Sequence, residues 1–147
     1  MKDKFNMSVD LNQTLAKRYV VDMIWKGANL EGIAVTFPQT QDVFDGLATT
    51  LKVNDIIVIN NLKHSWMFLL ETLYYDCDYA YICKINQLVG EGLYARAGFL
   101  IYVHVTMGGT TWVPEFPIES VIKEKLEEIL KIECVTERAI YLMLYCM

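Results

Sequence analysis

Apolar side chains recur every three or four residues along most of the chain, a spacing that predicts amphipathic helices. In the first such segment, Leu11, Leu15, Tyr19 and Met23 are each four residues apart, and Ala16, Val20 and Ile24 widen the stripe. We expect a helix from about Asn12 to Lys26 that buries this stripe and ends near Gly27, a residue that weakens helices.

Three further segments continue the helical pattern. Thr36, Phe37 and Pro38 resemble a helix start, because proline is tolerated in the first turn. We expect the buried side of this second helix to hold Val43, Phe44 and Leu47, with Gly46 weakening its end. Apolar residues at helical spacing predict a third helix over about 54–74 and a fourth over about 78–92.

The period changes to two after residue 99. Apolar Ile101, Val103, Val105 and Met107 alternate with Tyr102, His104 and Thr106, which is typical of a half-buried strand. Gly108 and Gly109 then supply the positive φ angles of a tight turn. The pattern predicts one β-hairpin over about 99–113.

Two more helices follow the predicted hairpin. The first opens near Pro117, with an expected inner stripe of Ile118, Ile122, Leu126 and Ile129. On its outer side the pairs Glu119/Lys123 and Glu127/Lys131 have the stabilising four-residue spacing. The second begins near Thr136, and residues 139–147 carry no charge.

The expected fold is therefore mainly α, a helical bundle with one β-hairpin, in a single domain over residues 1–147. A helix that is apolar on every side needs neighbours all round it. We therefore expect the C-terminal helix to be covered by a protein partner or by a second copy of the chain, or else to fold back onto its own core.

Composition and charge exclude several classes of protein. The chain has 147 residues, of which 54% are hydrophobic, so it is not intrinsically disordered. Its net charge of −5 gives no reason to expect nucleic acid or an anionic membrane as partner. No apolar run reaches the length of a membrane span, and the N-terminus lacks a secretory signal. We expect a cytoplasmic protein.

The cysteines Cys77, Cys83, Cys134 and Cys146 form no CxxC pair, and no histidine lies at zinc-finger spacing from them. We expect four small buried apolar side chains and no metal site. A metal or disulfide role is the second interpretation.

The order of the segments resembles that of the Fic (Fido-fold) proteins, whose active members transfer AMP from ATP to hydroxyl groups of target proteins. The resemblance covers about residues 12–147 and is carried by GANLEG (27–32), VTFPQT (35–40), NLKHSW (61–66), and GEG (90–92) leading to AG (97–98) and GGTTW (108–112). It implies an incomplete Fic-like domain with an inhibitory-type helix over about residues 12–31.

In the Fic family, the inhibitory helix ends in (Ser/Thr)-x-x-x-Glu-(Gly/Asn), and its glutamate pairs with an arginine that otherwise holds the ATP γ-phosphate. The resemblance assigns this regulatory role to Glu31 and Gly32, although Gly27 stands where Ser or Thr is usual. A paired carboxylate would occupy the place of the phosphate and repel it. The alternative is that Glu31 is simply a solvated acid near a helix end.

The predicted hairpin is similar to the family's flap, whose open edge pairs with target backbone. The resemblance therefore implies a docking role for Val103, His104, Val105, Thr106, Gly108 and Gly109. Ile101 departs from the family, which often has arginine at that position. The alternative is an ordinary hairpin that covers the core.

The family's catalytic motif, His-x-Phe-x-(Asp/Glu)-Gly-Asn-x-x-Arg, is absent from the 147 residues. We therefore expect no catalytic residues, no AMP transfer by this chain alone, and no cofactor; ATP and Mg²⁺ are expected only where the motif is supplied. Among residues that could substitute, His64 is expected to make structural hydrogen bonds and His104 to face solvent. Neither has a nucleophile at a recognisable spacing.

Two hypotheses follow. In the first, the chain is a truncated or degenerate Fic module that keeps the regulatory helix and the flap without AMP-transfer activity. In the second, it is a stand-alone interaction protein on a Fic-like scaffold, an inhibitor or antitoxin-like protein that offers Glu31 to a partner. An enzyme of unrelated chemistry has no support in the residues.

Overall fold

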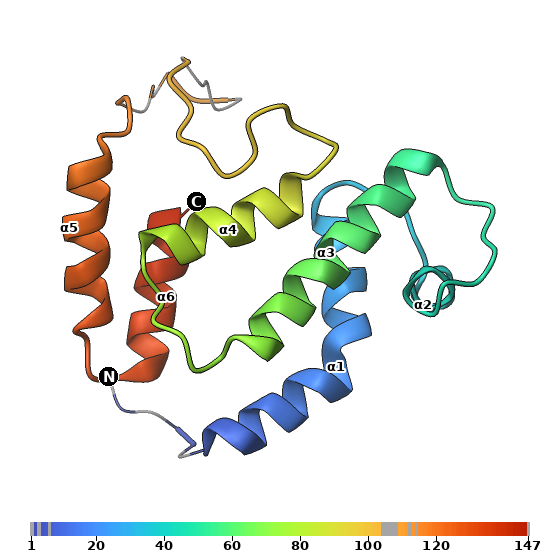
Figure 1. Cartoon of the computed structure of the whole chain (residues 1–147), viewed down its shortest axis with the longest axis horizontal. Coiled ribbons are helices and arrows are strands. Elements are labelled where there is room, and N and C mark those ends of the chain that lie inside the picture. The colour runs from blue at the N-terminus through green and yellow to red at the C-terminus, as the bar shows by residue number, and fades with distance from the viewer. Residues whose placement is uncertain are drawn as a thin grey trace.

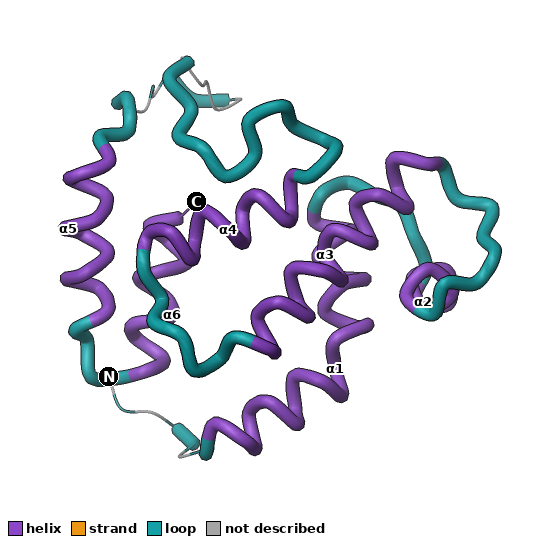
Figure 2. Tube along the Cα trace, in the orientation of Figure 1, coloured by secondary structure: helices purple, strands orange, loops and turns teal. Residues whose placement is uncertain are grey.

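The fold was analysed in a computed structural model that describes residues 2, 4–5, 7–103, 109–111, 113 and 115–146. The described residues are mainly α-helical (Figures 1 and 2) and form six helices: α1 (Val9–Leu30), α2 (Phe37–Phe44), α3 (Val53–Glu71), α4 (Tyr79–Gly90), α5 (Glu119–Leu130) and α6 (Val135–Cys146). The prediction of a mainly α fold is confirmed.

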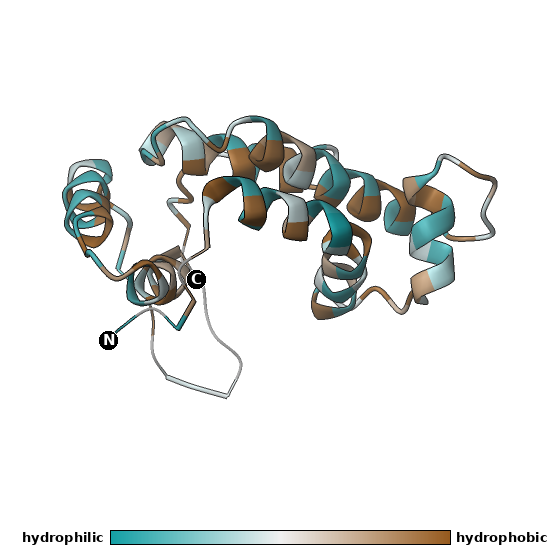
Figure 3. Ribbon diagram, turned by 90° about the horizontal axis from the view of Figure 1, so that it is seen from below, coloured by the Kyte–Doolittle hydropathy of each residue, from teal (hydrophilic) through white to brown (hydrophobic). Residues whose placement is uncertain are grey.

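The hydrophobic core lies where α1, α2 and α3 meet. Its buried members are Val20, Ile24, Ala28, Val35, Val43 and Ile59, against which Trp25 and Trp66 pack. α4 packs against α3, and α5 packs against α6. Figures 1 and 3 place α5 and α6 at one end of the molecule and α2 at the other, with α1, α3 and α4 between them.

The face that α1 buries matches the predicted one in part. Val20 and Ile24, which belong to the expected stripe, are buried together with Ala28. Four other residues of that stripe are exposed: Leu11, Leu15, Tyr19 and Met23. The helix also continues through Gly27 to Leu30. A Cβ added at Gly27 would contact only the end of the Leu62 side chain. The helical turns before Gly27 keep its backbone in the helical conformation.

The predicted start of α2 is confirmed. Thr36 is its N-cap and Pro38 lies in the first turn. The backbone N–H of Gln39 donates to the Thr36 hydroxyl (3.4 Å), and the Thr36 N–H donates to the Gln39 side-chain oxygen (3.0 Å). This reciprocal capping box satisfies two backbone donors that a helix start leaves free.

We expect Thr36→Ala to lower the free energy of unfolding by about 1 kcal/mol, because it removes the side-chain acceptor of the cap. Thr36→Ser keeps a hydroxyl and should remain close to the native value. Urea unfolding followed by circular dichroism measures both. Equal stability of the two variants would show that the capping box contributes nothing.

Two expected inner residues lie at the surface. Leu47 is exposed because α2 ends at Phe44 and the chain turns away at Gly46, where φ is +73°. His64 is exposed as well, and no described residue forms a hydrogen bond with its side chain. On α3 it shares the outward face with Met67 and Glu71, three and seven residues further on.

In α5, Leu126 and Ile129 are buried as expected, but Ile118 precedes the helix and is exposed. The predicted Glu119–Lys123 ion pair is present at 2.6 Å. The second predicted pair, Glu127/Lys131, is not formed. Instead, Lys125 pairs with Glu128 at 2.7 Å, a spacing of three residues.

Residues 104–108 and 112 of the predicted hairpin lie outside the described part of the chain. The described residues 99–103, 109–111 and 113 are not in strands. None of the described helices is both long and apolar enough to cross a lipid bilayer.

Candidate functional site

Glu31 lies directly after the last residue of α1, where the chain reverses. Gly32 has a φ of +81°, which favours glycine. The Gly32 N–H donates to the Asn29 carbonyl (3.1 Å), and the Ile33 N–H donates to the Ala28 carbonyl (3.0 Å). These two bonds form a Schellman motif, which fixes the path of the chain at the helix end.

The Val35 carbonyl ties the far end of the turn that follows Glu31 back to α1. Two side chains of α1 donate to this oxygen, the Trp25 indole N–H at 2.9 Å and the Asn29 amide at 3.2 Å. Trp25 also contacts the edge of Phe37, with ring centroids 6.0 Å apart. The backbone around Glu31 is therefore tied to α1 before and after the glutamate.

The Glu31 side chain is exposed, and no described residue donates a hydrogen bond or an ion pair to its carboxylate. Leu30 beside it is 88% exposed, so an apolar and an acidic side chain protrude together from a rigid turn. This geometry suits a carboxylate that meets a cation from outside the described chain. It is equally compatible with a solvated acid.

The exposed face of α1 leads to this turn. Leu11, Leu15, Tyr19 and Met23 follow one side of the helix, and Leu30 continues it. An ion pair between Lys26 and Asp22 (2.7 Å) lies on the same face. We call this surface the α1 stripe. Leu11, Leu15, Tyr19 and Met23 were predicted to be buried, and their exposure makes this surface an apolar approach to Glu31.

The segment after α4 folds back along that helix. The buried Asn61 amide donates to the carbonyls of Val89 (3.0 Å) and Glu91 (2.7 Å), so α3 holds the end of α4. Further along, the Gly98 N–H donates to the Asn86 side-chain oxygen at 2.8 Å. Of the glycines singled out by the Fic resemblance, Gly90 therefore lies in α4, and Gly92 and Gly98 follow close to it.

Of the predicted docking residues, only Val103 and Gly109 belong to the described part of the chain. Val103 is exposed in a loop, and Gly109 is exposed with a φ of +81°. His104, Val105, Thr106 and Gly108 lie outside the described residues. Within this set, the structure therefore describes the placement of Val103 and Gly109 alone.

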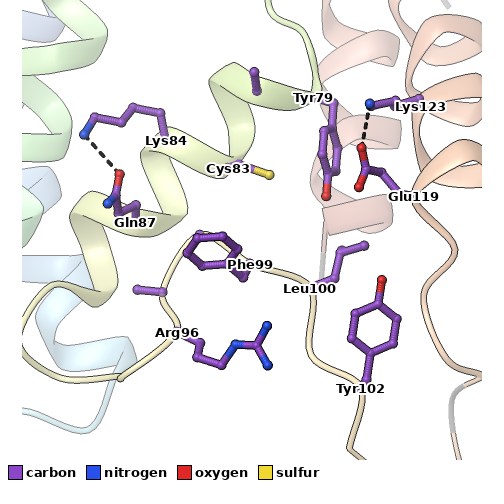
Figure 4. Close-up of a pocket in the computed structure, with 13 residues that line it drawn as sticks. Tyr79, Cys83, Lys84, Gln87, Arg96, Phe99, Leu100, Tyr102, Glu119 and Lys123 are labelled. Atoms are coloured by element: carbon purple, nitrogen blue, oxygen red, sulfur yellow. Dashed lines mark hydrogen bonds and ion pairs between the residues drawn. The ribbon is translucent and has the colours of Figure 1, made fainter.

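A pocket of about 600 Å³ opens between α4, residues 96–102 and α5 (Figure 4). Burial raises the pKa of Tyr79 to about 12, helped by its hydrogen bond with the Cys83 thiol and by the nearby charge of Glu119. The ammonium of Lys123 lies 5.1 Å from the Tyr79 ring centroid and pairs with Glu119.

The described side chains around this pocket do not form a catalytic arrangement. No histidine is among the lining residues that the structure describes, so none of them offers the Cys83 thiol an imidazole base. The Lys84 ammonium is bound to the Gln87 side chain at 3.1 Å. Sequence reasoning missed this pocket because its residues come from α4, a loop and α5, which no common motif links.

The described part of the chain contains neither a candidate metal site nor a disulfide bond. It contains no group of three His, Cys, Asp or Glu side chains that could hold a metal ion. The four cysteines are free. Cys77, Cys83 and Cys134 are half-buried, but Cys146 is exposed, contrary to the expectation that all four are buried.

Comparisons with family models, with curated proteins and with solved structures found no match for this chain.

Proposed function

We propose that this chain is a Fic-like regulatory module that acts by placing the Glu31 carboxylate against an arginine side chain, without transferring AMP itself. The single observation that supports this is the setting of Glu31, exposed in a turn whose backbone is fixed by the Schellman motif and by the Val35 carbonyl. The Fic-like bundle, the flap over residues 99–113 and the role of its edge belong to the same proposal.

The chemistry of such a contact follows from the geometry of the two groups. A guanidinium can offer two parallel N–H groups to one carboxylate, and the pair then excludes a phosphate from the same arginine by occupancy and by like charge. A hydrogen bond to a charged group contributes about 1.5–3 kcal/mol, equivalent to about 10- to 150-fold in affinity. Loss of Glu31 should therefore have a large effect on inhibition.

The alternative function is a stand-alone inhibitor or antitoxin-like protein that acts on a separate chain. The exposed α1 stripe favours it, because an apolar surface that ends at the acidic turn could carry a partner to Glu31. The two versions share the same chemistry. They differ in whether the arginine belongs to this protein or to another one.

The test measures inhibition in trans. The chain is added to an AMP-transferring Fic protein that lacks its own inhibitory helix, with labelled ATP and Mg²⁺. We expect native chain to reduce labelling and Glu31→Gln to raise the concentration for half-inhibition by about 10- to 150-fold. The chain incubated alone with the same reagents is expected to incorporate no label.

Glu71→Gln provides the matched control. Glu71 is another exposed glutamate, at the C-terminal end of α3, so its substitution changes net charge and a helix end in the same way. It should inhibit like the native chain. Equal potency of native chain and Glu31→Gln would remove Glu31 from the mechanism, and labelling by the chain alone would refute the absence of catalysis.

A further inference from the structure

A second cavity, of about 540 Å³, lies next to the pocket beside Tyr79. Residues of α4, the loop that follows it, α5 and the end of α6 line this cavity. The two spaces are adjacent, because five residues line both of them: Tyr79, Cys83, Gly98, Phe99 and Leu100. Small-molecule sites typically have volumes of about 300–1,000 Å³, so each space is large enough to hold part or all of a ligand.

The walls of the second cavity are mostly apolar. Glu115 is the one charged side chain among the described residues that line it. Four aliphatic side chains come from three separate elements: Ile82, Ile101, Ile122 and Leu126. We call this space the apolar cavity. Its walls match a hydrocarbon chain, which needs no hydrogen-bond partner.

Large side chains of the loop after α4 remain exposed beside these two spaces. Phe99 is 65% exposed, Ile101 is 59% exposed and Tyr102 is 58% exposed. Each of the three lines the pocket, the apolar cavity or both. A bound hydrocarbon chain would remove such apolar surface from water, which is favourable in proportion to the area covered.

The pocket beside Tyr79 is different, because it carries positive charge. Its described lining includes three cations, Lys84, Arg96 and Lys123, and one acid, Glu119. The excess of two positive charges occurs in a chain whose net charge is −5. We call this space the cationic pocket. A negatively charged group is attracted to it although the chain as a whole is acidic.

Arg96 is the cation of this pocket that has no anionic partner among the described residues. Lys123 pairs with Glu119 at 2.6 Å, and Lys84 is bound to the Gln87 side chain. The Arg96 guanidinium lies 6.0 Å from the Phe99 ring centroid (Figure 4). A guanidinium can donate two parallel N–H groups to one carboxylate, so Arg96 is suited to hold such a head group.

We propose that the two spaces together bind one molecule of a fatty acid, with its alkyl chain in the apolar cavity and its carboxylate against Arg96. A single unpaired guanidinium matches a head group with one negative charge. A phosphate carries up to about two negative charges, and Glu119 in the same pocket would repel the second one. The proposal does not depend on Glu31, which follows α1.

Isothermal titration calorimetry of the full chain with dodecanoate, below its micelle-forming concentration, tests this proposal. We expect one dodecanoate to bind per chain. Dodecanol has the same alkyl chain without the charge, and it should bind about 10- to 150-fold more weakly, equivalent to one hydrogen bond to a charged group. Hexanoate keeps the carboxylate but fills less of the apolar cavity, so it should also bind more weakly.

Arg96→Gln tests the position of the carboxylate. It should weaken dodecanoate binding by the same factor of about 10- to 150-fold and leave dodecanol binding unchanged. Arg18→Gln is the matched control, because Arg18 is an exposed arginine of α1 that lines neither space. It should bind both ligands like the native chain.

Ile101→Asn tests the position of the alkyl chain. It places an amide in the apolar cavity and should weaken the binding of both dodecanoate and dodecanol. Leu47→Asn is its control, because Leu47 is 58% exposed and lies in the α2–α3 loop, at the other end of the molecule from α5 and α6 (Figure 1). Circular dichroism confirms that each variant keeps its helices.

Three results would overturn the proposal. The first is that dodecanoate does not bind, and the second is that dodecanoate and dodecanol bind equally well. The third is that either cavity variant binds dodecanoate with the same affinity as its control.

Discussion

Replacing Gly98 with alanine is expected to destabilise the protein by about 2–6 kcal/mol, from two separate costs. The first is backbone strain, because φ at Gly98 is +82° and an alanine there costs about 1–3 kcal/mol. The second is overpacking, because a Cβ would lie 2.8 Å from the Cys83 carbonyl oxygen and 2.9 Å from the Gln87 Cβ. Urea unfolding measures the total.

Gly46→Ala separates the two costs. Gly46 has a φ of +73°, but a Cβ there meets nothing within 4 Å, so only the strain remains. We expect Gly98→Ala to be the more destabilising variant, and hydrogen exchange at residue 98 to increase as its bond to Asn86 weakens. Equal losses in the two variants would show that the segment moves away from α4 without cost.

Asn61→Ala is the second substitution with a large expected effect. The Asn61 side chain is buried and donates to two backbone carbonyls, those of Val89 and Glu91. Alanine removes both hydrogen bonds, which are partly buried, and each such bond contributes about 0.5–1.5 kcal/mol. We expect a loss of about 1–3 kcal/mol in the free energy of unfolding.

The neighbouring Asn60 supplies the control. It lies on the same helix, and no described residue forms a hydrogen bond with its side chain. Asn60→Ala should change stability by less than about 0.5 kcal/mol. If the two alanine variants unfold at the same urea concentration, Asn61 does not hold the end of α4 to α3.

Helix positions could be predicted from the sequence because the apolar spacing and the end signals agree. The Thr36 cap with Pro38 gave the start of α2. The buried face of α1 was predicted only in part, because apolar residues occupy more than one side of this helix. Val20, Ile24 and Ala28 are buried, and the α1 stripe is exposed. Periodicity places Val20 and Ile24 in one wide stripe with Leu11, Leu15, Tyr19 and Met23, but it does not say which part of that stripe meets α3.

The candidate site was predicted only in part, for a similar reason. Glu31 was singled out by a local pattern, and the structure adds that its carboxylate is exposed in a fixed turn. The pocket beside Tyr79 was not predicted, because it depends on how α4, α5 and the loop with Arg96 pack. Contacts between elements distant in sequence leave no spacing signal in the chain.

The two hydrogen bonds to the Val35 carbonyl have a thermodynamic consequence for any protein that engages Glu31. Ordering a flexible backbone costs about 1–2 kcal/mol per residue, and here folding has already met that cost for residues 31–35. An isolated peptide with the sequence of residues 27–35 would have to become ordered on binding. It should therefore bind the same arginine far more weakly than the intact chain.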